Sequence, residues 1–400
     1  IYYIIYIMES IVGYTFESIE QLKAFSELTD TGKAEIFGNY MKSKVKAYGK
    51  IIRFYIYDEH LKLWIDKNEN EFMTFMFSWF DKTAKNIKVL TNGLGDDKIN
   101  KLIKDFDKSG FINTIYKRCI GLLYDENFIL SLNNNHDYLP IKDGKKINLK
   151  SLEITDRTAD DRFTFFCNVS LTKETPKADK FFSDIYPNKD IREYVRKCLG
   201  YMLSGDTSAR CFFVFYGVGK NGKTQICNLL EKILCNYYTT CSEEVFKEKT
   251  SIGGASPHML SLLGKRVGVY SEGETSDNMS LDFSNIKKIS GQDKINARGL
   301  YRDPIEFYAT VKLILLSNYT PPLNAETAIK DRLHYIFNDV RFTDNPGQDE
   351  KKADNDFIQQ LQTLYLDQVF TWIIQGSKGY YESDKKLIKP KEFIDRTDIL

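Results

Sequence analysis

The chain has 400 residues, of which 56 are basic and 55 acidic, leaving a formal net charge of +1. Hydrophobic residues make up 42% and charged residues 28%, with only 9 prolines, and this composition excludes disordered, collagen-like and mucin-like chains. Because the charges balance overall, an electrostatic site for nucleic acid must come from local clustering.

Cysteine and histidine usage argues against a structural zinc site and for a reducing compartment. The seven cysteines include no C-x-x-C pair, and the four histidines are far apart in the sequence. An odd number of cysteines favours reduced thiols in a cytosol-like compartment. The apolar start, residues 1–7, is far shorter than the ~20 residues of a membrane span and lacks a signal-peptide pattern. It is either an ordinary first strand or a stretch upstream of a true start at Met8, and no membrane partner is expected.

The first half of the chain predicts a mixture of helices and short antiparallel strands. Residues 50–57 and 61–64 have the composition of two strands joined by a tight turn, which indicates a hairpin. Residues 71–84 have helical periodicity, and residues 139–149 predict a second hairpin that turns at Asp-Gly. Residues 191–203 have the apolar spacing of a helix. These elements predict a mixed α+β region ahead of the segment in which the chemical motifs begin.

A strand, a glycine-rich loop and a helix follow one another directly from residue 210. Residues 210–216 are nearly all apolar, as expected for a strand that is buried on both faces of a parallel sheet. Residues 217–224 match the pattern G-x-x-x-x-G-K-[ST] at every fixed position, and apolar residues from Ile226 onward recur with helical spacing. This order predicts a phosphate-binding loop made of Gly217, Val218, Gly219, Lys220, Asn221, Gly222, Lys223 and Thr224.

Each residue type in this loop has a physical reason. Glycines allow the backbone to curl so that successive N–H groups point at the phosphates, and the helix N-terminus adds a partial positive charge. Lys223 supplies a point charge for the β- and γ-phosphates, and the Thr224 hydroxyl is the expected magnesium ligand. We therefore expect a nucleoside triphosphate with Mg²⁺ at this loop; the alternative is a chance match in a glycine-rich turn.

Two further apolar strands end in polar residues that suit catalysis. Residues 265–270 predict one strand, which is followed by Glu272 and Glu274. Ligands of such sheets bind at the carboxyl ends of the strands, so Glu272 is the first candidate, and Glu274 the second, to hold Mg²⁺ through water and polarise the attacking water. Residues 311–318 predict the other strand, and its Asn318 is a candidate to bond the γ-phosphate or the attacking water. Ordinary polar turn residues are the alternative for both strand ends.

A locally basic segment lies between these two strands. Residues 294–298 and 305–308 predict a hairpin whose tip is formed by residues 299–302. Basic side chains with an aromatic ring among them suit the phosphates and bases of single-stranded nucleic acid, whereas the alternative is a solvated hairpin. The candidate DNA-binding residues are Lys287, Lys288, Lys294, Arg298, Tyr301 and Arg302.

Arg332 stands between a short helical stretch at residues 325–330 and the apolar residues 333–337. Its guanidinium is a candidate to reach the γ-phosphate of a neighbouring subunit and to neutralise charge in the transition state. An ordinary surface or ion-pairing arginine is the alternative.

The order of these motifs resembles that of the superfamily 3 helicases of DNA viruses and phages. Within that group it resembles the helicase part of the poxvirus-type primase–helicase of nucleocytoplasmic large DNA viruses. The matching stretches of the ATPase region are residues 217–224, 271–274, 286–293, 297–298, 315–318 with Pro321, and 331–333. The stretches that resemble the family's helicase-associated N-terminal domain are residues 31–37, 55–64, 139–144 and 199–205. The loop motif is specific to nucleotide binding, and the combination and spacing of the motifs single out the superfamily.

The resemblance implies an AAA+ type P-loop ATPase core of α/β class with a mainly parallel sheet, preceded by a mixed α+β N-terminal domain. It implies a ring-shaped hexamer that hydrolyses ATP with Mg²⁺ and moves along single-stranded DNA at a replication fork.

By position, Lys223 and Thr224 would bind phosphate and magnesium, and Glu272 would be the catalytic carboxylate and a metal ligand. Asn318 would be the sensor, and Arg332 the arginine finger that acts in trans. The expected domains are residues 1–180 (collar or adaptor), 181–205 (helical linker), 206–342 (ATPase) and 343–400 (C-terminal helical segment).

Two departures from the family pattern and three rival functions stay open. Many members carry paired acids where this chain has Ser271-Glu272, which leaves the role of Glu274 open. No paired-acid metal site of a primase is visible, so the chain is a stand-alone helicase or a fragment, and its abrupt end favours a fragment.

A primase domain or polymerase accessory proteins are expected partners, in the host-cell cytoplasm or another reducing compartment. The rivals are an AAA+ motor that remodels a protein partner, a P-loop small-molecule kinase, and a ring component that binds ATP only for assembly.

Overall fold

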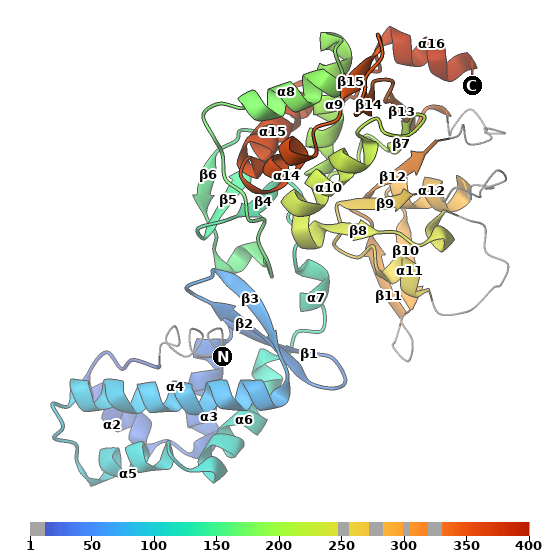
Figure 1. Cartoon of the computed structure of the whole chain (residues 1–400). Coiled ribbons are helices and arrows are strands. Elements are labelled where there is room, and N and C mark those ends of the chain that lie inside the picture. Colours follow the sequence, from blue (N-terminus) through green and yellow to red (C-terminus); the bar gives the residue numbers. More distant parts are fainter. Residues whose placement is uncertain (1–12, 247–255, 272–282, 299–303, 319–329, 400) are drawn as a thin grey trace. The chain divides into compact units, whose positions relative to one another are not determined.

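The computed structural model of the chain (Figure 1) describes residues 13–246, 256–271, 283–298, 304–318 and 330–399. Two compact units divide the chain. One contains residues up to 133 together with 157–165, and the other contains residues 134–156 and the chain from 166 onward. The boundaries of these two units differ from those of the four expected domains, which stay predictions. The expected first strand at residues 1–7 lies outside the described residues.

The first unit combines helices with a three-stranded antiparallel sheet in the order β1-β2-β3. The predicted hairpin is confirmed, because β2 pairs with β3 and Ile56 lies opposite Ile65. The predicted helix at 71–84 is also confirmed and is longer at both ends. The elements are α2 (Ile19–Glu27), α3 (Asp30–Met41), β1 (Val45–Tyr48), β2 (Arg53–Asp58), β3 (Leu63–Lys67), α4 (Glu69–Leu90), α5 (Asp97–Asp105), α6 (Ser109–Leu123) and α7 (Phe128–Ser131).

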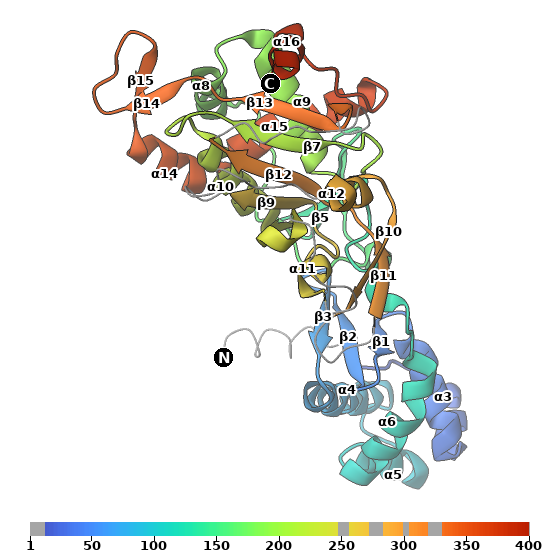
Figure 2. The ribbon, with the colours of Figure 1, turned by 90° about the vertical axis from the view of Figure 1, so that its right-hand side faces the viewer.

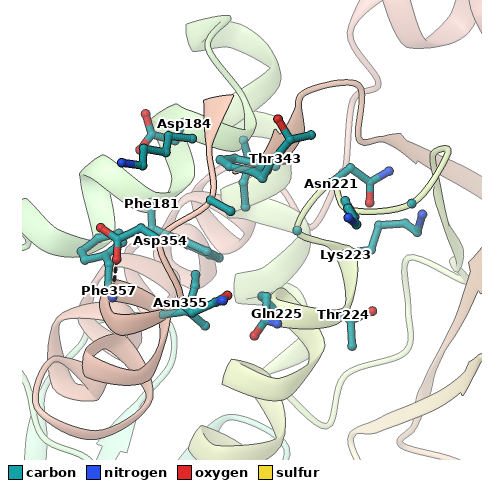
Figure 3. A pocket seen from close by; sticks show the side chains of 18 of the residues that line it. Phe181, Asp184, Asn221, Lys223, Thr224, Gln225, Thr343, Asp354, Asn355 and Phe357 are labelled. Carbon is teal, nitrogen blue, oxygen red and sulfur yellow. Dashed lines mark hydrogen bonds between the residues drawn. The ribbon is translucent and has the colours of Figure 1, made fainter. Parts of the chain in front are cut away.

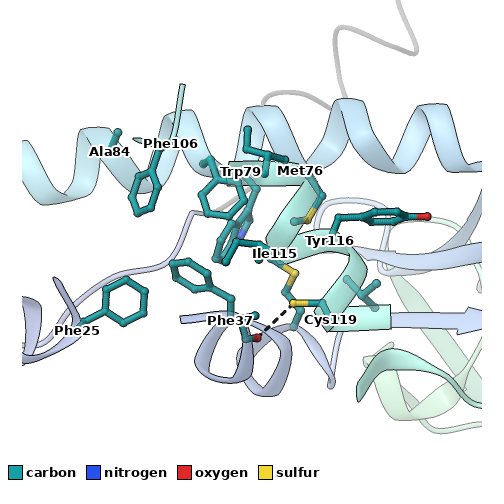
Figure 4. Close-up of a cluster of buried hydrophobic side chains, with 14 of the residues drawn as sticks. Phe25, Phe37, Met76, Trp79, Ala84, Phe106, Ile115, Tyr116 and Cys119 are labelled. Atoms are coloured by element: carbon teal, nitrogen blue, oxygen red, sulfur yellow. Dashed lines mark hydrogen bonds between the residues drawn. The ribbon is translucent and has the colours of Figure 1, made fainter. Parts of the chain in front are cut away.

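Aromatic side chains fill the core of this unit (Figure 4). The ring of Phe37 lies 4.9 Å from that of Phe25 and 4.9 Å from that of Trp79, between α2, α3 and α4. Helix α4 begins with a capping box in which Asn68 and Glu71 bond each other's backbone N–H groups. Such a cap contributes about 1 kcal/mol to the stability of a helix, and here it fixes the start of the helix that carries Trp79.

A five-stranded parallel sheet in the order β13-β7-β12-β9-β8 forms the centre of the second unit. Figure 2 shows β13, β7, β12 and β9 side by side. All six residues of β12 are buried, which agrees with a strand covered on both faces. The predicted α/β class with a mainly parallel sheet is thereby confirmed. The strands are β7 (Phe212–Tyr216), β8 (Tyr238–Thr240), β9 (Val267–Ser271), β12 (Lys312–Ser317) and β13 (Leu333–Phe337).

Smaller sheets and helices surround this centre. The predicted hairpin at 139–149 is confirmed, and it belongs to an antiparallel sheet in the order β4-β5-β6. The predicted hairpin at 294–308 is confirmed as β10 and β11. The strands are β4 (Tyr138–Ile141), β5 (Lys145–Asn148), β6 (Ile154–Asp156), β10 (Lys294–Arg298), β11 (Pro304–Tyr308), β14 (Arg341–Thr343) and β15 (Glu350–Lys352). The helices are α8 (Pro176–Ile185), α9 (Lys189–Met202), α10 (Lys223–Leu234), α11 (Pro257–Leu260), α12 (Phe283–Ser290), α14 (Asn355–Thr363), α15 (Leu366–Glu382) and α16 (Lys391–Ile399).

Helices α9 and α15 cross with their backbones in direct contact, although more than 150 residues separate them in the chain. A Cβ atom on Gly200 would lie 2.0 Å from the backbone nitrogen of Ser377. A Cβ atom on Gly376 would lie 1.9 Å from the carbonyl oxygen of Arg196. Both distances are shorter than any real contact, so only glycine fits at the two positions. The crossing fixes the C-terminal helices against the helix that precedes the parallel sheet.

Candidate functional site

The glycine-rich loop connects the carboxyl end of β7 to the first turn of α10. Gly222 has φ +82°, a left-handed conformation that glycine adopts without steric cost. At Gly217 the restriction is space, because a Cβ atom there would lie 2.3 Å from the carbonyl oxygen of Asn338. The loop therefore turns back sharply before α10 begins, and the N-terminal backbone N–H groups of that helix are left for a ligand.

Lys223 and Asn318, predicted separately from two strand ends, lie together at this edge of the sheet. The Lys223 ammonium donates to the Asn318 Oδ1 at 2.9 Å and also to the carbonyl oxygen of Gly217. Parallel pairing explains the meeting, since Ser317 at the end of β12 lies opposite Tyr216 at the end of β7. Lys223 is only 6% exposed, and this burial lowers the pKa of its ammonium to about 8.

A buried amide pair fixes the loop from behind. Asn221 is 3% exposed, and its Nδ2 donates to the carbonyl oxygen of Asn338 at 2.9 Å. The Nδ2 of Asn338 donates in turn to the carbonyl oxygen of Asn221 and to the hydroxyl of Tyr186. Sequence reasoning missed Asn338. It directly follows the apolar strand β13, as Asn318 follows β12, so the same signal was present at residue 338.

A cavity of about 510 Å³ opens beside the loop, and Figure 3 shows Lys223 and Thr224 at its lining. Thr224 is exposed to the cavity, and so is Ser271, the last residue of β9. Hydroxyl oxygens are the hard donors that Mg²⁺ prefers, so this part of the lining fits the expected ion. Among the described residues, no group of three or more His, Cys, Asp or Glu side chains could hold a metal ion. The expected carboxylates, Glu272 and Glu274, lie outside the described residues.

Arg332 lies at the opposite edge of the parallel sheet, immediately before β13. Its carbonyl oxygen accepts from the N–H of Phe212, the first residue of β7, whereas the glycine-rich loop follows the last residue of that strand. One guanidinium nitrogen donates to the carbonyl oxygen of Lys287 at 3.0 Å and to the Ser290 hydroxyl at 3.1 Å. The side chain therefore caps the end of α12 and is separated from the loop of its own chain by the length of the sheet.

Two more cations at this amino edge are fully buried. Arg266 directly precedes β9, and Lys312 is the first residue of β12; each is 1% exposed. The Arg266 guanidinium donates to the carbonyl oxygens of Leu203, Asn135 and Tyr138. The Lys312 ammonium donates to the carbonyl oxygens of Ser204 and Thr310, and burial places its pKa well below the ordinary range of lysine. Each cation thus binds one main-chain carbonyl directly after α9, that of Leu203 or Ser204, and further carbonyls of other segments.

The candidate DNA-binding hairpin has one buried and one exposed face. Ile295 and Phe307 are buried, while the side chains of Lys294 and Tyr308 are exposed, Tyr308 to 63%. The Lys294 ammonium lies 2.5 Å from a carboxylate oxygen of Glu306, a pair that the sequence reasoning missed. Arg298 is also exposed, and Lys287 and Lys288 lie in the last turn of α12. The candidates Tyr301 and Arg302 lie outside the described residues.

Comparison with known proteins gives matches over much of the chain. Residues 215–332 match a family model described as a family of unknown function (DUF5906). A protein of Acanthamoeba polyphaga mimivirus named "Putative helicase" is 32% identical over 235 residues, which cover 57% of this chain and 24% of the viral protein. A protein of African swine fever virus named "Putative primase" is 24% identical over 287 residues, covering 65% of this chain and 29% of that protein. A primase of fowlpox virus is 25% identical over 327 residues, covering 76% of this chain and 38% of that protein.

Among solved structures, the apo structure of the NrS-1 C-terminal region aligns with 92% of this chain and 74% of that chain, with a TM-score of 0.51. Its sequence identity is 11%, so this likeness shows the fold alone. The curated relatives are longer proteins, of which this chain spans between 24% and 38% of the length. Their similarity confirms the predicted relationship to the viral primase–helicases of superfamily 3. Of the helices that the structure describes, none is long and apolar enough to cross a membrane.

Proposed function

We propose that the chain is the ATP-driven DNA helicase part of a viral replication protein. The observation that carries this proposal is the meeting of Lys223 and Asn318 beside a glycine-rich loop at the carboxyl edge of a parallel sheet. The motif order and the relatives named as helicases and primases support the step from nucleotide binding to replication. In this proposal ATP hydrolysis drives the chain along single-stranded DNA and unwinds the duplex.

The loop and the residues near it would each bind or act on a different part of the triphosphate. Backbone N–H groups and the Lys223 ammonium would hold the β- and γ-phosphates, because the loop and the first turn of α10 line the cavity. Thr224 and Glu272 would hold Mg²⁺, which supplies charge neutralisation between the β- and γ-phosphates when bound. Asn318 would leave Lys223 for the γ-phosphate and so sense its presence. Glu272, with Glu274 as the second choice, would polarise the attacking water.

Arg332 would complete the site of a neighbouring subunit. Its guanidinium lies at the sheet edge opposite its own loop, so it cannot reach a phosphate held by the same chain. A ring in which the amino edge of one subunit faces the carboxyl edge of the next would bring the two together, and a hexamer is the ring that we propose. The partners would be single-stranded DNA, a replication fork, and a primase domain or polymerase accessory proteins in the host-cell cytoplasm.

The hairpin β10–β11 would contact DNA through its exposed face. Lys294→Ala should weaken binding of a single-stranded oligonucleotide and reduce the slope of log affinity against log salt by about 1, because one phosphate contact is lost. Glu306→Gln is the matched variant: it releases Lys294 from its ion pair and should strengthen binding. Unchanged affinity in both variants would exclude the hairpin as a DNA contact.

The decisive experiment measures ATP turnover of the full chain with and without single-stranded DNA, together with the mass of the particle in solution. We expect a ring that forms with ATP and DNA and a turnover that DNA stimulates. A turnover that is indifferent to DNA but responds to a protein would favour the remodelling motor, and phosphate transfer to a small acceptor would favour the kinase. A permanently monomeric chain with full turnover would contradict the proposal.

A further inference from the structure

The three-stranded sheet β1-β2-β3 of the first unit has two faces of different composition. Val45 and Ala47 of β1 and Phe54 of β2 are buried in the aromatic core of that unit. Successive side chains of a strand point to opposite faces of its sheet. Lys46 and Tyr48, which alternate with Val45 and Ala47 along β1 and are half-buried, therefore lie on the other face. This second face combines a cation with an aromatic ring.

Two tyrosine rings stack on this second face. Lys46 lies opposite Tyr55 of β2, and the rings of Tyr48 and Tyr55 are 5.3 Å apart with an interplanar angle of 23°. The Tyr48 hydroxyl donates to the Asp66 carboxylate at 2.8 Å, and the Arg53 guanidinium binds the same carboxylate at 2.6 Å. Both rings are half-buried. Aromatic rings that are held in place but still partly exposed suit the stacking of flat bases.

Three cations lie near this tyrosine pair: Lys42, which precedes β1, Lys46 and Arg162. Within the residues that the structure describes, none of these three side chains has a carboxylate at ion-pair distance. Burial lowers the pKa of the Lys46 ammonium, the Asp125 carboxylate opposes this shift, and the positive charges of Arg162 and Lys42 add to it. Three cations that repel one another, with a single carboxylate opposing them, favour a bound anion.

Arg162 reaches this face from the later segment of the first unit, residues 157–165. Its guanidinium lies 5.4 Å from the centre of the Phe128 ring, and that ring lies 5.7 Å from the ring of Tyr55. The backbone of Arg162 has φ +54°, a left-handed conformation that arginine rarely adopts. Its carbonyl oxygen accepts from the N–H of Asn133 at 3.0 Å, which helps to hold this conformation. Backbone strain concentrates at functional sites, which agrees with a role for this cation in binding.

We propose that the tyrosine–cation face, made of Lys42, Lys46, Tyr48, Tyr55 and Arg162, binds single-stranded DNA. The cations match the phosphates and the stacked rings match the bases of an unpaired strand. An acidic protein would match the cations but would leave the tyrosine pair without a role. The inference rests on the proposed function and adds a DNA contact in the first unit to that of the hairpin β10–β11. This contact is tolerant of sequence, because every base has a face that can stack.

The first test separates base contacts from phosphate contacts by comparing two ligands on the full chain. One is a fluorescent oligothymidylate, and the other is an oligonucleotide of the same length in which every site is abasic. Tyr48→Ala should weaken binding of the oligothymidylate about tenfold, the usual effect of losing one stacked base, and leave the affinity for the abasic strand unchanged. Tyr48→Phe keeps the ring and should keep both affinities. Equal weakening of the two ligands, or weakening of neither, by Tyr48→Ala would overturn the proposal.

The second test addresses the charges. Lys46→Gln should reduce the slope of log affinity against log salt by about 0.7 for both ligands, because one phosphate contact to a single strand is lost. Lys85→Gln is the matched control, since Lys85 is an exposed lysine of the same unit whose ammonium is paired with Asp81 at 2.6 Å. Its slope should equal that of the unchanged chain. An unchanged slope in Lys46→Gln, or an equal reduction in the control, would contradict the inference.

The outcomes separate the tyrosine–cation face from the proposed function. Binding of neither ligand by the unchanged chain would overturn the proposed function on which the inference rests. Binding that Lys294→Ala weakens, but Tyr48→Ala and Lys46→Gln do not, would overturn the tyrosine–cation face while the hairpin contact stands. Preserved binding of the abasic strand by Tyr48→Ala also shows that this variant is folded.

Discussion

The two edges of the parallel sheet both carry buried cations, but these cations have different surroundings. At the carboxyl edge, Lys223 bonds one carbonyl oxygen and the amide of Asn318, and it borders a cavity. At the amino edge, Lys312 and Arg266 bond only main-chain carbonyl oxygens in the contacts described above. Burial alone therefore does not mark a functional cation. An adjoining cavity and a partner that can be exchanged for a ligand distinguish Lys223.

The comparison predicts its largest effect at Lys223. Lys223→Ala should abolish measurable ATP binding, because a buried charged partner of the phosphates is lost, and losses of this kind weaken binding at least ~30-fold. The measurement is equilibrium titration with a fluorescent ATP analogue. ATP affinity close to that of the unchanged chain would show that the carboxyl edge is not the nucleotide site.

Arg332 tests whether the amino edge also acts on a neighbouring subunit. Arg332→Ala should keep ATP binding and lower kcat by ~10³-fold, as expected for an arginine finger. Mixing this variant with Lys223→Ala should restore part of the activity, since some interfaces then combine an intact Lys223 with an intact Arg332. Near-normal turnover of Arg332→Ala alone would leave only its contacts to Lys287 and Ser290, which stabilise the end of α12.

The pH dependence of ATP binding follows from the lowered pKa of Lys223. The ammonium of the free protein loses its proton as the pH rises through about 8, so ATP affinity should be constant below that pH and fall about tenfold per unit above it. The dissociation constant measured across this range tests the prediction. Lys223→Arg provides the control, because a guanidinium stays charged and its profile should be flat. A falling profile in the arginine variant would assign the titration to another group.

Lys312→Met should have the smallest effect on function and act on stability instead. The carbonyl oxygens of Ser204 and Thr310 lose their donor, which costs ~1–3 kcal/mol, partly offset by removal of a desolvated charge. The midpoint of urea unfolding should fall while ATP affinity stays unchanged. A loss of ATP affinity without a loss of stability would remove the distinction between the two edges.

The parts of the site that are local in sequence could be predicted from it. Lys223 follows a strand and opens a helix within one short stretch, and Asn318 ends an apolar run, so spacing alone placed both residues at the carboxyl edge. Phe342 and Phe357 could not be found in this way, because they reach the cavity only after the chain returns past β13 and no local pattern marks that return. The ion pair of Lys294 with Glu306 was only partly predictable. The hairpin was predicted correctly, but its register, which brings the two side chains together, was not known from the sequence.

The crossing of α9 and α15 has a consequence for the order in which the molecule matures. A ribosome makes the glycine-rich loop long before residue 376, and chains fold from their N-terminal side during synthesis. Helix α15 packs against Gly200, and the segment just ahead of it contributes Phe342 and Phe357 to the cavity. Both are made only when most of the polypeptide exists. A nascent chain therefore contains the glycine-rich loop before residues 341–358 have been made, and the nucleotide site is completed only late in translation.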